Sequence, residues 1–253
     1  MDSLTVTIDE RIVTRVPGYV LGLIALPEIE VTRFSGAVDA LLTEAEGALH
    51  RESPGRAEIA ALPAVAAWRE AYRAFGVNPS RFPCAVESLL RRVAKGDRLP
   101  RINSMVDLCN AVSLATRLPI ASCDIGTVTG RDREPGRLTV RPSDGSEVYL
   151  PLGAPGAPEH PDPGEVVYAD GQGRAHSRRW NWRQSDLIKT VPGRRRLLIT
   201  VEAVHQDGTA AVDAALARLT AALKEHTGEV LGPVVLDRAA RSGRPFAASA
   251  LSR

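Results

Sequence analysis

Cysteine is scarce in this chain, and no cysteine is placed as in a metal site or a disulfide framework. The 253 residues include three cysteines, none in a Cys-x-x-Cys pair and none spaced from histidines as zinc ligands are. Isolated cysteines of odd number, in a chain long enough to bury a core, are typical of a reducing compartment. We therefore expect a cytoplasmic protein that uses neither a metal nor another cofactor.

The motifs of the common catalytic classes are also missing. The sequence has no Walker A loop, no His-Glu-x-x-His and no Gly-x-Ser-x-Gly. Residues 171–173, Gly-Gln-Gly, begin a dinucleotide-binding pattern, but His176 stands where its last glycine belongs, and Asp170-Gly171 is typical of a turn. The five histidines are scattered, and each by itself is more typical of a surface position than of a base or a ligand.

Long apolar runs and a strong net charge are absent as well. The apolar run 20–26 is interrupted by Gly22 and is too short to cross a bilayer. The first residues lack the basic segment and apolar run of a signal peptide. With 32 basic and 30 acidic residues, the net charge of +2 indicates no particular partner. We expect a soluble protein without a membrane or DNA partner.

The chain does carry an ordinary globular composition, 44% apolar and 25% charged, with local patterns of both helix and strand. Alternation and turn residues predict strands at 4–8, 19–26, 120–124, 165–169 and 197–204. Caps and apolar stripes predict helices at 36–51, 64–75, 83–95, 104–116 and 210–226. Strands at 138–141 and 147–150 flank a predicted hairpin turn. The fold class is therefore α/β of the α+β type, with a largely antiparallel sheet flanked by helices.

These elements predict a single domain over residues 1–232. Within it, residues 1–62 supply N-terminal strands and a helix, and residues 63–232 form the core. The segment 233–253 is rich in alanine and arginine, and we expect a flexible tail there.

Polar residues interrupt the apolar helix and strand predicted for residues 101–124. They are Arg101, Asn103, Asp107, Asn110 and Asp124. Polar groups at such positions are costly to bury unless each is paired. The run therefore either holds the fold together with hydrogen bonds or lines a pocket.

A second unusual stretch is residues 178–183, Arg-Arg-Trp-Asn-Trp-Arg. Guanidinium groups bind phosphate, and aromatic faces stack on unpaired bases, so Arg178, Arg179 and Arg183 are candidates for RNA binding. The alternative is that Trp180 and Trp182 fill the core while the arginines are solvated or paired with acids. The residues alone leave both interpretations open.

Four segments together resemble a known family. Residues 101–110, RINSMVDLCN, resemble the pattern RxxNxxVDxxN that opens the editing module, or B3/B4 domain, of the phenylalanyl-tRNA synthetase β subunit. Residues 118–124 are similar to its QPLHAFD stretch, residues 166–170 resemble its LVIAD strand, and residues 198–203 resemble the strand that carries its pocket glutamate. Order and spacing agree over roughly residues 80–205, about half the chain. The chain thus resembles a freestanding B3/B4 domain.

The resemblance implies a trans-acting deacylase that hydrolyses the ester of a mischarged aromatic or related amino acid on tRNA. Its partners would be the tRNA acceptor end and the amino-acid moiety. A site that hydrogen-bonds a substrate hydroxyl rejects the analogue without it by about 10⁴–10⁵, and Glu202 would be that acceptor. An edge position facing water is the other interpretation of Glu202, which its apolar neighbours 197–201 disfavour.

The remaining site residues follow from the same resemblance. We expect Asn110 and Asn181 to orient the substrate or stabilise the oxyanion. Asp124, Trp180 and Trp182 would line the substrate site with Glu202, and Arg178, Arg179 and Arg183 would hold the acceptor end. The strongest geometric expectation is that Asn110 and Glu202 face each other across a hollow sized for one residue attached to RNA.

Two departures from the family favour an alternative. Ala121 stands where QPLHAFD has its histidine, and residues 179–183 replace a glycine-rich turn that shapes the family's amino-acid pocket. A non-catalytic module that binds RNA, tRNA or a free amino acid on the same fold is therefore the second hypothesis. A protein-interaction domain without affinity for either is the third.

Overall fold

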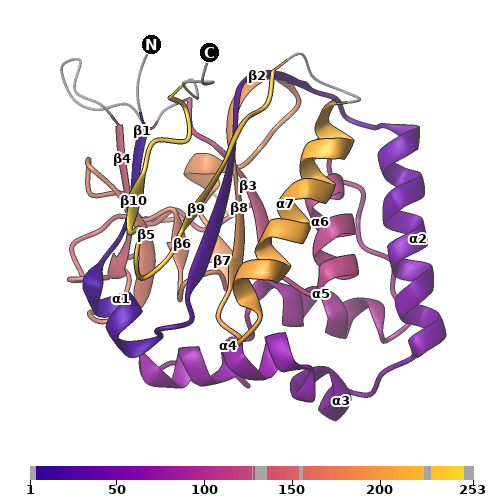
Figure 1. Ribbon diagram of the computed structural model, residues 1–253, viewed down its shortest axis with the longest axis horizontal. Helices are drawn as coiled ribbons and strands as arrows, with labels where there is room; N and C mark the ends of the chain where they lie inside the picture. The colour runs from indigo at the N-terminus through magenta and orange to yellow at the C-terminus, as the bar shows by residue number, and fades with distance from the viewer. Residues whose placement is uncertain (1–3, 127, 129–135, 154–155, 225–228, 248–253) are drawn as a thin grey trace.

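Two four-stranded sheets and the helices around them form the described part of the chain (Figure 1). The computed structural model describes residues 4–126, 128, 136–153, 156–224 and 229–247. Sheet A has the strand order β10-β1-β4-β5, and sheet B has the order β3-β8-β2-β9. Among the described strands only β1 and β4 pair in parallel, which confirms the largely antiparallel α+β class.

The strands of both sheets, with the small β6–β7 pair, are β1 (Leu4–Ile8), β2 (Val20–Val31), β3 (Ile120–Asp124), β4 (Gly136–Pro142), β5 (Val166–Asp170), β6 (Ser177–Arg178), β7 (Arg183–Gln184), β8 (Gly193–Ala203), β9 (Leu231–Leu236) and β10 (Ser242–Gly243). The α-helices are α1 (Glu10–Arg15), α2 (Gly36–Glu52), α3 (Arg56–Ala61), α4 (Pro63–Ala74), α5 (Ala85–Val93), α6 (Ser104–Thr116) and α7 (Gly208–Lys224). A short 3-10 turn spans Asp186–Ile188. The predicted helices are confirmed over the described residues, and residues 225 and 226 of the last one lie outside them. The helices α1 and α3, of six residues each, carry too few periodic positions to be recognised.

Residues at the helix starts themselves determine where these helices begin, so their starts could be predicted from the sequence. Ser35 caps α2 by accepting a hydrogen bond from the Val38 amide, and the Asn103 side chain caps α6. Pro63 occupies the first turn of α4, where its missing N–H costs nothing.

The predicted hairpin at 138–150 is wrong. Strand β4 pairs with β1 and with β5, while residues 148 and 149 make only isolated bridges elsewhere. The turn is held by side chains instead, because the buried carboxylate of Glu147 accepts the Ser143 hydroxyl and pairs with Arg141 at 2.5 Å. These contacts send the chain away from β4 and free its edge for β5.

Sheet B lies in the middle of the molecule, with one face toward α6 and α7 and the other toward sheet A (Figure 1). Successive side chains of β8 point to opposite faces of sheet B, and both faces are covered, so β8 is buried on both. Ile199 and Val201 pack with the helices, whereas Leu198 packs with the cluster that includes Tyr168 and Trp180. The position of β8 between β3 and β2 makes it a central strand of sheet B.

The C-terminal segment contributes structure beyond residue 232. Strand β9 spans that predicted boundary and pairs with β2, and β10 pairs with β1. Residues 248–253 of the predicted tail lie outside the described residues.

Candidate functional site

The polar run that begins at Arg101 holds the fold together. Arg101 reaches α2, where its guanidinium pairs with Asp39 at 2.6 Å and with the buried Glu46 at 2.9 Å. These carboxylates raise the pKa of Arg101. The Asp107 carboxylate accepts the Ile102 amide at 2.9 Å. The sequence left two interpretations open for this run, hydrogen bonds that hold the fold together or the lining of a pocket. For Arg101 and Asp107 the first applies.

Asn103 joins the same structural network. Its side-chain oxygen accepts the amides of Met105 and Val106, and its amide nitrogen donates to the Thr190 carbonyl at 2.9 Å. It therefore fixes the start of α6 and ties that helix to the segment before β8.

A cavity of about 170 Å³ lies between the edge strand β3 and its neighbour β8 on one side and β4, β5 and the β6–β7 pair on the other. Its apolar wall includes Pro119, Ile120, Ala121, Leu138 and Ile188. Its polar lining includes Tyr168, His176, Trp180, Asn181, Thr200 and Glu202. The structure thus brings together Glu202, Asn181, Trp180 and Trp182, four of the residues that the sequence singled out.

Glu202 is the polar centre of this cavity. It is 3% exposed and sits near the end of β8. Its Oε1 accepts the hydroxyls of Tyr19 at 2.7 Å and Tyr168 at 2.6 Å, and the indole N–H of Trp180 at 3.1 Å. Its Oε2 accepts the side-chain N–H of Asn181 at 2.8 Å. The edge interpretation of Glu202 is therefore excluded by its burial.

The protonation of Glu202 is governed by burial. Burial raises the pKa of its carboxyl above the usual 4.5, and the four hydrogen-bond donors oppose this rise without cancelling it. The hydroxyl oxygens of Tyr19 and Tyr168 also lie 3.1 Å apart, so they form a triangle with Oε1. Both tyrosine hydroxyls therefore donate to the same carboxylate oxygen.

Asn181 links Glu202 to two helices. Its side-chain oxygen accepts the Tyr72 hydroxyl of α4 at 2.9 Å and the Ala85 amide of α5 at 3.3 Å. One N–H of its amide donates to Glu202, which leaves the second N–H at the cavity wall without a partner among the described residues.

Trp180 forms one wall through a strained turn. Arg179 and Trp180 have φ of 46° and 67°, a left-handed backbone that bulky residues rarely adopt and that costs about 1–3 kcal/mol per residue. The Trp180 ring is 1% exposed and packs edge-on against Tyr19, Trp68 and Phe75, at centroid distances of 4.9, 5.1 and 5.6 Å. These contacts and its bond to Glu202 hold the turn.

His176 is a cavity residue that the sequence did not identify. It is 2% exposed, and its Nε2 lies 3.1 Å from Asp170 Oδ2. Burial raises the pKa of Asp170, but hydrogen bonds from His176 and Arg174 outweigh it and lower that pKa to about 2. The ionised Asp170 favours the tautomer with the proton on Nε2. In the sequence, Asp170-Gly171 is typical of a turn, and no local pattern indicated that Asp170 and His176 would form a pair.

Asn110 and Asp124 do not line the cavity, which corrects the expected pairing of Asn110 with Glu202. Asn110 belongs to α6, which packs on the opposite face of sheet B. Asp124 pairs in register with Leu197, whose side chain points away from the Glu202 face of the sheet. The Asp124 carboxylate accepts the Gly126 amide at 3.0 Å and lies 3.6 Å from Arg195.

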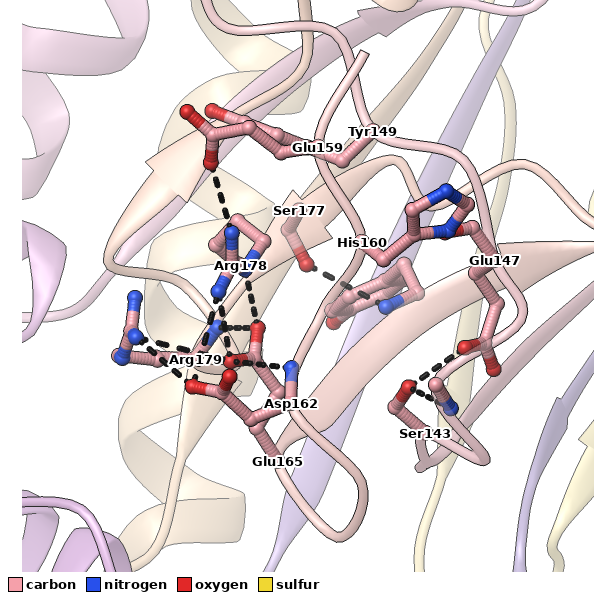
Figure 2. A network of polar contacts seen from close by, with 12 residues as sticks. Ser143, Glu147, Tyr149, Glu159, His160, Asp162, Glu165, Ser177, Arg178 and Arg179 are labelled. Atoms are coloured by element: carbon pink, nitrogen blue, oxygen red, sulfur yellow. Dashed lines mark hydrogen bonds and ion pairs between the residues drawn. The ribbon is translucent and has the colours of Figure 1, made fainter.

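Arg178 is a structural residue, contrary to its expected role in RNA binding. It is 6% exposed and pairs with Glu165 at 2.5 Å and with Glu159 at 2.8 Å (Figure 2). Arg179 belongs to the same network, because its guanidinium lies 3.1 Å from Asp162. Acidic neighbours therefore already neutralise these two arginines.

Arg183 is exposed at the cavity rim and stacks on aromatic rings there. Its guanidinium carbon lies 4.4 Å from the Trp182 ring centroid, and Trp182 packs edge-on against Phe82 at 4.9 Å. Arg81, also exposed, lies 5.0 Å from the Phe82 centroid. We call Arg81, Phe82, Trp182 and Arg183 the aromatic rim. The sequence analysis identified Trp182 and Arg183, but nothing in the sequence indicated that Phe82 would pack against them.

The cavity offers little for metal or thiol chemistry. Cys123 lines it, but burial raises the pKa of this thiol to about 12, so the thiolate is disfavoured at neutral pH. Within the described residues, no three side chains of the His, Cys, Asp or Glu type gather as a metal site requires. None of the helices in the described ranges has the length and hydropathy needed to cross a bilayer.

One family model matches more than half of the chain. The family model of the B3/4 domain matches residues 67–228. Among solved structures, the chain is similar to an N-terminal fragment of the phenylalanyl-tRNA synthetase beta-subunit from Pyrococcus horikoshii, at 13% sequence identity and a TM-score of 0.43. That match covers 90% of this chain and 50% of the other, so the chain spans about half of that fragment. No curated protein matches the sequence.

Proposed function

The chain belongs to the B3/4 domain family, and from this premise we propose that it is a trans-acting deacylase for mischarged aminoacyl-tRNA. The substrate bond would be the ester that joins an aromatic or related amino acid to the terminal ribose. The observation that carries the proposal is the apolar cavity in which Glu202 and Asn181 are the central polar groups.

The size of the cavity suits one amino-acid side chain. An engineered protein cavity of roughly 150 Å³ with apolar walls binds benzene. The cavity here has about 170 Å³ and mostly apolar walls, and the exposed residue Arg183 is part of its lining. A side chain of aromatic or similar size would therefore enter, and the nucleotide to which it is joined would stay outside.

The polar groups at the cavity suit an ester substrate. Glu202 Oε2 receives one hydrogen bond from the protein and has room to accept another from a substrate hydroxyl. The second N–H of Asn181 would donate to the oxygen that becomes negative as water attacks the carbonyl carbon. Because an aminoacyl ester is intrinsically labile, a positioned water and such a donor suffice without a covalent nucleophile.

The aromatic rim would hold the acceptor end of the tRNA. Arg81 and Arg183 carry positive charge on exposed side chains, and no ion pair is formed by either among the described residues. Guanidinium groups bind phosphate bidentately, and a terminal base stacks on rings such as Trp182. This arrangement would place the ester at the mouth of the cavity.

The decisive experiment measures release of amino acid from a panel of mischarged tRNAs. We expect release of an aromatic or related amino acid well above the spontaneous rate of the same ester without protein. Correctly charged tRNAs for the same amino acids serve as controls for selectivity. No release from any substrate at high protein concentration would end the proposal.

The second candidate is a non-catalytic module that binds tRNA or an amino acid. It is favoured by the engagement of Glu202 Oε1 with three protein donors and by Ala121 at the position of the family histidine. It predicts saturable binding of an aminoacyl-tRNA analogue with no release of amino acid.

The aromatic rim gives a prediction that holds for both candidates if RNA binds there. Replacing Arg183 by glutamine should weaken tRNA binding about three- to tenfold at 0.1 M salt and reduce the salt slope by about one, because one phosphate contact is lost. Arg218→Gln is the matched control, since Arg218 is exposed on α7 behind sheet B. Filter binding over a salt series measures both. Equal affinities of the two variants would show that the rim does not bind RNA.

A further inference from the structure

The hydroxyl of Thr200 faces the cavity and forms no hydrogen bond with a described residue. Thr200 lies on β8 two residues before Glu202, is 5% exposed and lines the cavity. Its hydroxyl is not among the polar atoms sealed off inside the described part of the chain. Other buried hydroxyls nearby are paired, since Ser122 and Thr190 contact each other at 2.9 Å.

The alternation of β8 directs this hydroxyl to the Glu202 side of sheet B. Residues two apart on a strand share a face and lie about 7 Å apart along it. Thr200 is therefore next to Glu202 on the cavity wall. A hydroxyl that faces a cavity without a protein partner can be completed by a ligand or a water.

Of the two cross-strand neighbours of Thr200, Leu23 on β2 is large and the one on β3 is small, so the open space lies on the β3 side. Thr200 pairs in register with Ala121 of β3, and both residues line the cavity. Directly opposed residues on one face have Cβ atoms about 4.5–5.5 Å apart. The methyl side chain of Ala121 leaves room next to the Thr200 hydroxyl, and the nearby wall, with Pro119 and Ile120, offers no competing side-chain hydrogen bond.

We propose that Thr200 binds the water that attacks the substrate ester, in the space beside Ala121. This inference rests on the proposed deacylase function. The threonine hydroxyl would accept a hydrogen bond from the water and turn a water lone pair toward the carbonyl carbon. A threonine hydroxyl can accept and donate, which suits a water that must be both held and oriented.

The reaction balances without a further reactant. The water oxygen forms a bond to the carbonyl carbon, and the bond from that carbon to the ribose oxygen breaks. One water proton ends on the ribose oxygen, and the other is released to solvent when the carboxylic acid product ionises. Thr200 forms no covalent bond and returns unchanged.

The test is Thr200→Val, which keeps the branched shape and removes only the hydroxyl. We expect kcat for release of the amino acid to fall about 100-fold, with KM within about twofold, because the water is no longer positioned. Thr200→Ser should retain most of the activity. Thr139→Val is the matched control, since Thr139 lies on β4 beside the cavity residue Leu138 and faces the other side of the sheet.

Thermal unfolding of each variant separates a loss of chemistry from a loss of fold. Thr200→Val should unfold at the wild-type temperature or above it, because an unpaired polar group is removed. If the wild-type protein releases amino acid and Thr200→Val does so at the same kcat, the inference is wrong while the deacylase function stands. If the wild-type protein releases none from any substrate, both are wrong.

Discussion

Replacing Glu202 by alanine is expected to lower the free energy of unfolding by about 3–5 kcal/mol. The change leaves the donors of Tyr19, Tyr168, Trp180 and Asn181 buried without their acceptor. Each unsatisfied donor costs more than a hydrogen bond normally gains, because its lost hydration is not replaced. Urea unfolding followed by tryptophan fluorescence measures the effect, since Trp180 sits in the affected cluster.

Glu30→Ala is the matched control for this measurement. Glu30 is an exposed glutamate near the end of β2 in the same sheet, so its replacement should change stability by less than about 0.5 kcal/mol. A rescue variant tests the mechanism directly. Adding Tyr19→Phe and Tyr168→Phe to Glu202→Leu removes donors together with their acceptor and should recover part of the loss. Equal stabilities for Glu202→Ala and Glu30→Ala would contradict the assigned network.

The same carboxyl predicts a pH dependence of stability. Because burial raises the pKa of Glu202, the folded protein binds this proton more tightly than the unfolded chain does. The stability that this group contributes is therefore fully present below pH 4.5 and is lost as the pH rises through the folded-state pKa. Glu202→Gln cannot titrate, so its stability should lack that component when the two proteins are compared from pH 4 to pH 8.

Arg178→Met is the second change with a large expected effect, a loss of about 3–5 kcal/mol. It removes two charged hydrogen bonds from Glu165, a carboxylate that is 4% exposed and accepts the Nε–H and an Nη2–H of Arg178 (Figure 2). Glu165 then keeps the backbone amides of Asp162 and Arg179, with the Arg179 guanidinium at 3.9 Å. Arg183→Met is the matched control, because the same substitution at the exposed rim removes no ion pair among the described residues. Denaturant unfolding of both variants gives the comparison.

The double variant Arg178→Met with Glu165→Gln identifies the cause of the loss. Neutralising the Glu165 carboxylate should restore stability relative to Arg178→Met alone, and the coupling between the two positions should exceed about 1 kcal/mol. Additive effects of the two changes would show that Arg178 acts through packing alone. An unchanged stability of Arg178→Met, together with weakened tRNA binding, would restore its interpretation as an RNA contact.

Local patterns were sufficient where the structure depends on neighbours in the sequence. The cap at Asn103, the proline at residue 63 and the apolar stripe of α7 each act within a few residues, so the helix positions could be predicted. The resemblance of residues 101–110 to the family was informative about the fold. The described contacts give its polar residues structural roles: Arg101 reaches α2, while Asn103 and Asp107 bind backbone groups at and beside the start of α6.

Partners across the molecule could not be predicted, because they depend on which strands become neighbours. The turn after β4 looked like a hairpin, yet β4 pairs with β1 and β5. Phe82 and Trp182 are far apart in the chain and are in contact only because the segment before α5 packs beside the β6–β7 pair in the folded protein. His176 becomes a cavity residue through its contact with Asp170, which no spacing rule indicated.

The sequence by itself determined the class of fold and, through the resemblance to the family, pointed to Glu202, whose apolar neighbours on the strand disfavoured an edge position facing water. Tertiary structure decided which polar residues share its cavity. The strand register places Thr200 on the side of Glu202 and Asp124 on the other, and α6 carries Asn110 behind the sheet. A residue's side of a sheet is set by pairing, and pairing is a property of the folded chain.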